Sequence, residues 1–296
     1  MADPGGPVGL VINRPPRLLG LEPFLIELME GIEEVFSPLD RSVLFNIATS
    51  HEQEIAIWRR WTEQGAVDAL VMLDIYPDDD RLPVLADLGV PAVVLGGPRG
   101  VLPFSNVYVD SAAGAAQAVD ALADLGHRRI AYVSGPRRLL HSQTRSEAFL
   151  AQCAARDCRG VLVEGDYYET SGHDATLDLL SLDDAPTAIF YDNVVMAVAG
   201  LGVLGDRGLS VPADVSLMVW DDTALSRLTP PGLTVVAVDV HSLGVAVADA
   251  VLAVLGGAPV TTYDAPSPKV RLRGSTGPAP GRSGESGESG TQEVRE

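Results

Sequence analysis

The chain has 296 residues, of which 46% are hydrophobic, so it is long enough to bury two cores of ordinary domain size. Its formal net charge of −19, from 21 basic and 40 acidic residues, argues against direct binding along a nucleic-acid backbone or an anionic membrane. The first residues lack the regions of a signal peptide, and no apolar run reaches transmembrane length. We therefore expect a cytoplasmic protein without a membrane partner.

The first part of the chain alternates between strand-type and helix-type hydrophobic patterns. Apolar runs of strand length occur at residues 8–13, 42–48, 69–75, 90–95 and 106–110. Helical spacing of apolar residues, or a helix start, follows four of them, at residues 24–35, 52–64, 78–80 and 111–125. The fourth strand is instead closed by residues 96–98. Residues 14–17, with two prolines between two arginines, are typical of a loop.

The same alternation resumes after residue 128. Strands are predicted at 129–134, 160–165, 187–191, 216–220, 233–238 and near 269–273. Helices are predicted at 142–156, 171–180, 194–207 and 241–255. This pattern indicates an α/β protein with doubly wound parallel sheets, and its two runs indicate two lobes with a crevice between them. Residues 277–296 are rich in Gly, Ser and Glu, and we expect a disordered tail.

The segment 185–222 predicts a strand–helix–strand unit whose two strands are parallel. In open α/β sheets, ligands bind just outside the carboxyl ends of the strands. Asn193 and Asp221 stand at those two ends, with Tyr191 and Trp220 beside them. Polar groups flanked by aromatic rings favour a small polar ligand.

A GxGxxG pattern at Gly200, Gly202 and Gly205 does not indicate dinucleotide binding, because the glycines lie inside the predicted helix and not in the turn before it. Close helix packing is the better interpretation. The sequence contains no nucleophile elbow, phosphate-binding loop or zinc pattern. We therefore expect no enzyme, no catalytic residue, no cofactor and no metal site.

Several sequence motifs occur in a recognisable order. They are LGHRRIAYVSGP (125–136), Arg145 with Phe149, PTAIFYDNVVMA (186–197), RGLSVPADVSLMVWDD (207–222), PPGLTV (230–235) and LRGST (272–276). Over residues 8–276 the chain resembles the effector-binding core of LacI/GalR-type transcription regulators, which have a periplasmic-binding-protein-like fold. Two positions depart from that pattern, because Val194 replaces the Asp of an Asn-Asp pair and Val219 replaces a Gly.

The resemblance implies two lobes joined by three crossovers, with residues 8–126 plus 238–262 in one lobe and 127–237 plus 263–276 in the other. It also implies a small effector, often a sugar, between the lobes and a homodimer. Operator DNA would be bound only through a helix-turn-helix headpiece, expected before Val8 and not present in this sequence. The alternative is a free-standing cytoplasmic sugar- or solute-binding protein with no role at DNA; an enzyme on this fold is a more distant third.

Eight residues are candidates for the ligand site. Asp110 precedes a helix, so it is an N-cap, a ligand contact, or both. Arg145 is either a solvated helical Arg or a ligand contact; the resemblance favours contact, since it matches the family's Arg four residues before an aromatic, and an Arg fork can bind adjacent hydroxyls or a carboxylate. For the other six, ligand contact competes with a turn or core role: Asn193, Asp221, Tyr191, Trp220, Asn13 and Phe24.

Overall fold

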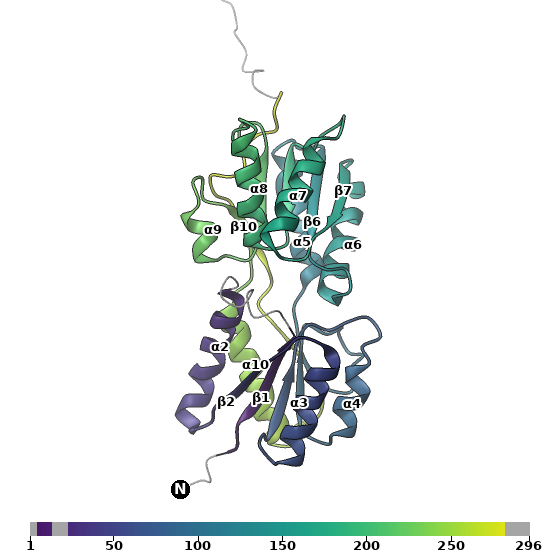
Figure 1. The fold of residues 1–296 in the computed structure, drawn as a ribbon, viewed down its shortest axis with the longest axis vertical. Coiled ribbons are helices and arrows are strands. Elements are labelled where there is room, and N and C mark those ends of the chain that lie inside the picture. The colour runs from purple at the N-terminus through teal and green to yellow at the C-terminus, as the bar shows by residue number, and fades with distance from the viewer. Residues whose placement is uncertain (1–4, 14–22, 282–296) are drawn as a thin grey trace, which may run out of the picture.

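Two six-stranded sheets, each covered by helices on both faces, form two lobes stacked end to end (Figure 1). This computed structural model describes residues 5–13 and 23–281. The predicted loop at 14–17 and most of the predicted tail, residues 282–296, lie outside the described residues. The two-lobed α/β class expected from the sequence is confirmed. In the described ranges, no helix is long and apolar enough to span a membrane.

The first sheet has the order β2-β1-β3-β4-β5-β11, and all its neighbouring strands are parallel. Its strands are β1 (Val8–Asn13), β2 (Val43–Ala48), β3 (Ala69–Met72), β4 (Ala92–Leu95), β5 (Ser105–Tyr108) and β11 (Thr262–Asp264). One face packs on α2 (Pro23–Phe36) and α10 (Val240–Leu255), and the other on α3 (His51–Glu63) and α4 (Arg81–Asp87). A short 3₁₀ turn, Ser37–Leu39, follows α2.

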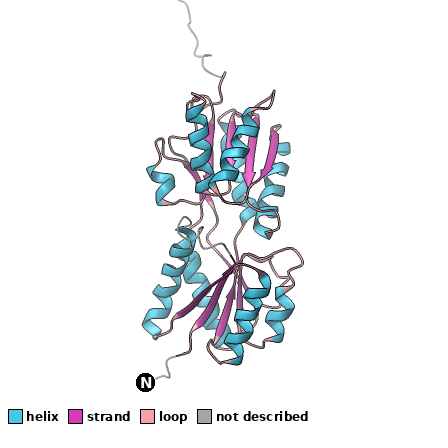
Figure 2. Cartoon of the chain, viewed as in Figure 1, coloured by secondary structure: helices cyan, strands magenta, loops and turns pink. Residues whose placement is uncertain are grey.

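The second sheet has the order β7-β6-β8-β9-β10-β12. Its strands are β6 (Arg129–Ser134), β7 (Arg159–Glu164), β8 (Ala188–Tyr191), β9 (Ser216–Trp220), β10 (Thr234–Ala237) and β12 (Lys269–Arg271). Its helices are α5 (Ser111–Asp124), α6 (Leu140–Ala155), α7 (Glu169–Leu180), α8 (Val194–Asp206) and the short α9 (Ala224–Leu228), drawn in cyan in Figure 2. β12 runs antiparallel to β10, so this sheet is only mostly parallel.

The continuous apolar runs are explained by burial of both faces of each sheet. Along β8, Phe190 belongs to the core under α5 and α6, whereas Ile189 and Tyr191 belong to the core under α7 and α8. The same period of two separates Leu10 and Val11 on β1 into the cores on opposite faces of the first sheet. Because both faces of these strands are apolar, their sequences do not show the alternation of apolar and polar residues that marks a half-buried strand.

Two short elements were missed by the sequence analysis. β11 has only three residues, none of which is buried, and α9 has only five, with Leu225 and Leu228 exposed. Neither segment is long enough to show a hydrophobic period. The sequence analysis assigned no element to either stretch.

Three expected boundaries need correction. α5 packs against α6 and β12 of the second lobe, so the chain first crosses between β5 and α5 and not at residue 126 (Figure 1). β11 continues to Asp264 in the first sheet, so the last crossing follows residue 264 and not 262. The tail is also shorter than expected, because Gly277 bonds to Ser216 and the amide of Ala279 donates to the carbonyl of Leu125.

A buried ion cluster joins α3, α4 and the loop between β3 and α4. Arg81 is 1% exposed, and its Nη1 donates to both carboxylate oxygens of Glu54 at 3.0 and 2.9 Å. Its Nε and Nη2 donate to Asp79 at 2.9 and 2.7 Å. Burial raises the pKa of Glu54 to about 7; Arg81 acts in the opposite direction, and the nearby carboxylates of Asp74 and Asp79 add to the rise.

We predict that Glu54 makes the stability of the chain depend on pH near neutrality. Its folded pKa lies above its usual value, so its contribution to stability is full at low pH and is lost as pH rises through about 7. From about pH 6 to about pH 8, the free energy of unfolding should fall by about 1 kcal/mol more in the wild type than in Glu54→Gln. Urea unfolding of both proteins across this range measures the difference. Parallel pH profiles would contradict the prediction.

Candidate functional site

A cavity of about 400 Å³ lies between the two lobes. The first lobe contributes apolar and backbone groups, including Phe24, Leu73 and the turn at residues 96–98 after β4, together with Asp74, Arg99 and Tyr108. The second lobe contributes the ends of β8 and β9 and the starts of α6 and α8. The cavity therefore lies at the carboxyl ends of the strands, as expected for open α/β sheets.

Asp192, directly after β8, is the polar centre of the second-lobe wall. Its carboxylate is fully buried and accepts hydrogen bonds from the Tyr132 hydroxyl at 2.5 Å and from Arg145 Nη1 at 2.8 Å. The second oxygen accepts from the amide of Gly135 and the Tyr167 hydroxyl, both at 3.1 Å. Burial acts to raise the pKa of Asp192, but the charge of Arg145 and these donors outweigh it and keep the pKa below its usual range.

Arg145 links this carboxylate to the aromatic wall. Its guanidinium carbon lies 3.7 Å from the centre of the Trp220 ring, and its side chain is 12% exposed. This stacking on a ring face, together with the ion pair, fixes the plane of the guanidinium. Its Nε is buried without a hydrogen-bond partner among the described residues. Arg145 therefore lines the cavity with its positive charge already balanced by Asp192.

The remaining polar groups of this wall are also preorganised. His141 Nε2 lies 2.9 Å from the Tyr167 hydroxyl, and Tyr167 has a φ of 71°. Asn193 caps α8, because its Oδ1 accepts from the amide of Met196 at 2.9 Å, and its amide group donates to the carbonyl of Tyr167. Asp221 has a φ of 70°, in the left-handed region that Asp and Asn tolerate better than most residues.

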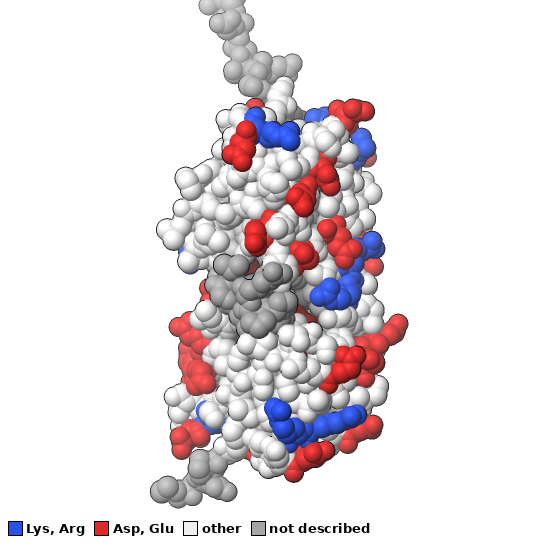
Figure 3. All heavy atoms as spheres, viewed as in Figure 1, with Lys and Arg blue, Asp and Glu red and all other residues white. Residues whose placement is uncertain are grey.

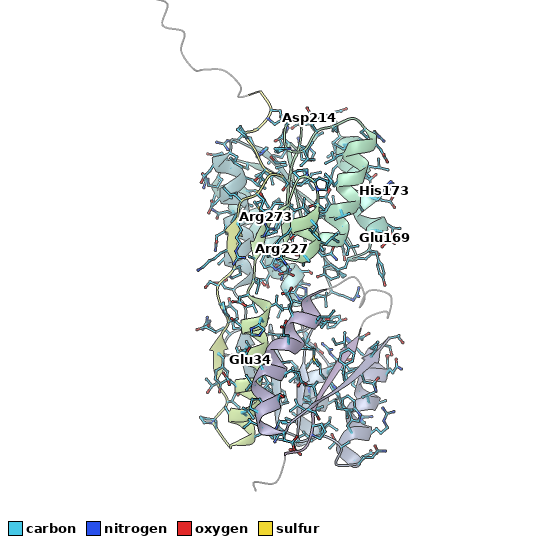
Figure 4. The ribbon with its side chains drawn as sticks, turned by 90° about the vertical axis from the view of Figure 1, so that its left-hand side faces the viewer. Glu34, Glu169, His173, Asp214, Arg227 and Arg273 are labelled. Carbon is cyan, nitrogen blue, oxygen red and sulfur yellow. The ribbon has the colours of Figure 1, made fainter. Side chains whose placement is uncertain are left out.

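Asp222, the next residue along the chain, stabilises the turn that carries Asp221. Asp222 accepts hydrogen bonds from Arg227 at 2.8 Å, Arg271 at 2.9 Å and Arg273 at 2.6 Å. Figure 4 shows Arg227 and Arg273 together on the second lobe. Burial acts to raise the pKa of Asp222, but the three arginines keep it below its usual range. Asp222 thus stabilises the turn through its arginine partners, whereas Asp221 lines the cavity.

The structure brings five of the eight candidate residues to the cavity. These are Phe24, Arg145, Asn193, Trp220 and Asp221. Asp110 is not part of the lining; it is the N-cap of α5, accepting from the amide of Ala113 at 3.0 Å, while its neighbours Val109 and Ser111 line the cavity. Asn13, at the end of β1, is also not part of the lining among the described residues.

Tyr191 requires a correction, because it belongs to the core and not to the ligand site. It is fully buried, and its hydroxyl lies 2.7 Å from Thr176 Oγ1 under α7 and α8. The missing side chain of Gly200 makes room for it, since a Cβ there would lie 2.1 Å from the hydroxyl. The expected packing role of the GxGxxG glycines therefore holds for Gly200. A Cβ added at Gly202 or Gly205 would have no neighbour within 4 Å, so these two glycines are not required for packing.

Three polar residues that line the cavity, Asp192, Tyr167 and His141, were not predicted from the sequence. Asp192 was visible as a polar residue directly after a buried strand, but Asn193 was chosen in its place. Tyr167 and His141 lie in loops and at a helix start with no pattern to mark them. Across the described ranges, no group of His, Cys, Asp and Glu side chains is arranged to bind a metal ion.

Comparison with known proteins identifies the family. Residues 119–276 match the periplasmic binding protein-like domain. The regulator CelR of Thermobifida fusca is 32% identical over 77% of this chain and 68% of its own length. A LacI family regulator from Bifidobacterium animalis has a TM-score of 0.85 and 30% identity, covering 92% of this chain and 98% of its own. The chain belongs to the LacI family.

Other LacI family regulators show the same extent of similarity. Catabolite control protein A of Priestia megaterium is 29% identical over 75% of this chain and 68% of its own length. The structure of a CelR–cellobiose complex has a TM-score of 0.83 at 26% identity, covering 92% of this chain and 86% of its own. These relatives are transcriptional regulators, and the similarity covers the effector-binding part of the LacI family.

We predict that Asp192→Ala is strongly destabilising, because it leaves Arg145 buried without its counter-charge and removes the acceptor of two tyrosine hydroxyls. The loss should be about 3–5 kcal/mol. A matched control is Asp184→Ala, which also removes an ion-paired aspartate, with Arg129 and Arg159, but on the surface, where the side chain is 46% exposed. That loss should be about 0–1 kcal/mol. Denaturant unfolding measures both, and equal losses would show that Asp192 is not the centre described here.

Proposed function

We propose that the chain is the effector-binding core of a LacI-type transcriptional regulator and that its effector is a small sugar bound in the cavity between the lobes. The observation that carries this proposal is the cavity itself, with a preorganised polar wall on one lobe and a largely apolar wall on the other. Pockets that bind small polar molecules combine these two features. The similarity to a regulator solved with cellobiose supports a carbohydrate.

The charges of the cavity favour a neutral ligand. Arg145 is paired with Asp192 and Arg99 with Asp264, so neither arginine of the lining is an uncompensated positive charge that calls for an anion. Asp221 and the amide of Asn193 offer an acceptor and a donor of hydrogen bonds at this wall, and Trp220, although almost fully buried under Arg145, contributes apolar surface to the lining. Val194 and Val195, at the start of α8, extend the apolar surface of the same wall.

A thermal-shift screen of neutral mono- and disaccharides tests the site. We predict that a sugar which stabilises the wild type binds Asp221→Asn roughly tenfold more weakly, because a charge-assisted hydrogen bond becomes a neutral one. Asn tolerates the backbone conformation of residue 221, so the fold should persist. The matched control is Tyr191→Phe, which removes a hydroxyl of β8 that points away from the cavity and should leave the affinity unchanged.

If Asp221→Asn binds the same sugar with wild-type affinity, the ligand does not lie where we propose. Arg145→Ala is a poor test of ligand binding, because it would leave Asp192 buried and unpaired and would weaken the fold together with the site. Isothermal titration of the hit with Asp221→Asn and Tyr191→Phe separates a local effect from a global one.

In this proposal, closure of the lobes on the effector changes DNA affinity through a helix-turn-helix headpiece outside the described residues, in a homodimer in the cytoplasm. The competing function is a free-standing sugar- or solute-binding protein that does not act at DNA. The family relationship supports the regulator, since the relatives are transcriptional regulators. An in-frame helix-turn-helix encoded upstream of Met1 would decide between them.

We predict that residues 1–296 form a homodimer and do not bind duplex DNA. Acidic side chains lie among the basic ones on both lobes (Figure 3), and the net charge of −19 repels phosphates. Light scattering at micromolar concentration should give twice the chain mass of 31.1 kDa. Titration with a labelled duplex should show no salt-sensitive binding at submicromolar protein. A clean monomer mass would refute the first expectation, and tight duplex binding the second.

A further inference from the structure

The two lobes exchange contacts at one edge of the cavity, away from the chain crossings. The amide of Leu140, at the start of α6 in the second lobe, donates a hydrogen bond of 2.8 Å to the carbonyl of Ile75 in the first. The side chain of Leu140 packs against the first-lobe core under α3 and α4. Conversely, Tyr76 from the first lobe packs against the second-lobe core under α7 and α8.

This exchange involves the segments that line the cavity. Leu73 and Asp74 precede Ile75, and both line it; Leu140 lines it together with His141. Any movement that separates Ile75 from Leu140 therefore displaces part of both cavity walls. One backbone hydrogen bond and two partly buried side chains are a small contact, so thermal opening and closing of this edge is energetically accessible.

The first-lobe partner is a loop, residues 73–80, whose backbone needs support. Asp74 and Asp78 have φ values of 52° and 51°, in a region that costs free energy for residues other than glycine. The loop is fixed mainly by Arg81, which donates to the carbonyl of Asp74 at 2.7 Å and to that of Leu73 at 3.4 Å.

Arg81 also acts on the loop through Asp79. One carboxylate oxygen of Asp79 accepts from Arg81 Nη2 at 2.7 Å and, at 3.0 Å, from the amide of Tyr76. The guanidinium carbon lies 5.1 Å from the centre of the Tyr76 ring. Bonds to Glu54 anchor the same guanidinium to α3. Only a planar group with several donors can make all these contacts at once.

We propose that the loop 73–80 and the start of α6 form a latch that joins the lobes beside the effector cavity, and that Arg81 is the positioning residue that keeps this latch in its closed shape. Arg81 is not among the residues that line the cavity, so it acts through Tyr76, Ile75 and Leu140. The latch is defined by contacts within the chain, and its existence does not depend on which effector, if any, binds.

Hydrogen exchange of the ligand-free chain tests this proposal. Arg81→Met should raise the exchange rate roughly tenfold or more in segment 73–82 and also in segment 137–144 of the other lobe, because the Leu140 amide loses its acceptor. The matched control is Leu85→Ala, which removes a fully buried side chain from the same helix but none of the loop's bonds. It should leave segment 137–144 at the wild-type rate.

A second pair of variants keeps the test decisive if Arg81→Met does not fold. Leu140→Pro removes the amide donor at the first helical position of α6, where Pro is well tolerated. The preceding Leu139 has φ −85° and ψ 131°, a conformation compatible with a following Pro. Leu140→Ala is the control, because it shortens the same side chain but keeps the donor.

Exchange in segment 73–82 should rise more in Leu140→Pro than in Leu140→Ala. The proposal is overturned if Arg81→Met leaves segment 137–144 as protected as in the wild type, if Leu85→Ala has the same effect as Arg81→Met, or if the two Leu140 variants exchange alike. None of these measurements requires an effector. The sugar screen and the hydrogen-exchange test of the latch can therefore fail independently of each other.

Discussion

A buried carboxylate at the end of β8 is the constraint on which the candidate site depends. A charge removed from water must be paired and hydrogen-bonded, or it costs several kcal/mol. Asp192 meets this requirement with one guanidinium, two tyrosine hydroxyls and one backbone amide, taken from β6, α6 and two loops. Residues between positions 132 and 192 are thereby fixed around one carboxylate, and several of them form the second-lobe wall of the cavity.

The two walls of the cavity are built on different physical principles. The second-lobe wall is stiff, because Asp192, Arg145 and Trp220 constrain one another through an ion pair and a stacked ring. The first-lobe wall combines apolar groups with Asp74, Arg99 and Tyr108, and it includes a loop with unfavourable backbone angles that Arg81 supports. Each wall depends on a buried, ion-paired arginine, but Arg145 lines the cavity and Arg81 does not. The cavity thus has a rigid wall on the second lobe and, on the first lobe, a loop that depends on Arg81 for its shape.

The sequence was sufficient for the fold class and most elements, because long apolar runs alternate with helical periods. It was insufficient where a side chain's direction decides its role. Tyr191 and Trp220 both end strands, yet Tyr191 belongs to the core under α7 and α8, whereas Trp220 belongs to the core on the other face of the sheet and also lines the cavity. Strands buried on both faces carry no polar alternation to reveal this. The mid-helix Gly200 was the one available signal, since it leaves space for the Tyr191 hydroxyl.

Lobe membership of α5 was equally hidden, because helix packing depends on tertiary contacts that a local pattern does not encode. The expected polar pair at the start of α8 is a related case. In the family pattern an Asp follows Asn193, and here Val194 occupies that position. The structure contains a carboxylate two residues earlier, at Asp192, where it is buried and balances Arg145 from behind. Val194 and Val195 then present apolar surface to the cavity. The wall thus keeps a counter-charge for Arg145 behind the cavity surface, while apolar side chains and not a carboxylate occupy the first positions of α8.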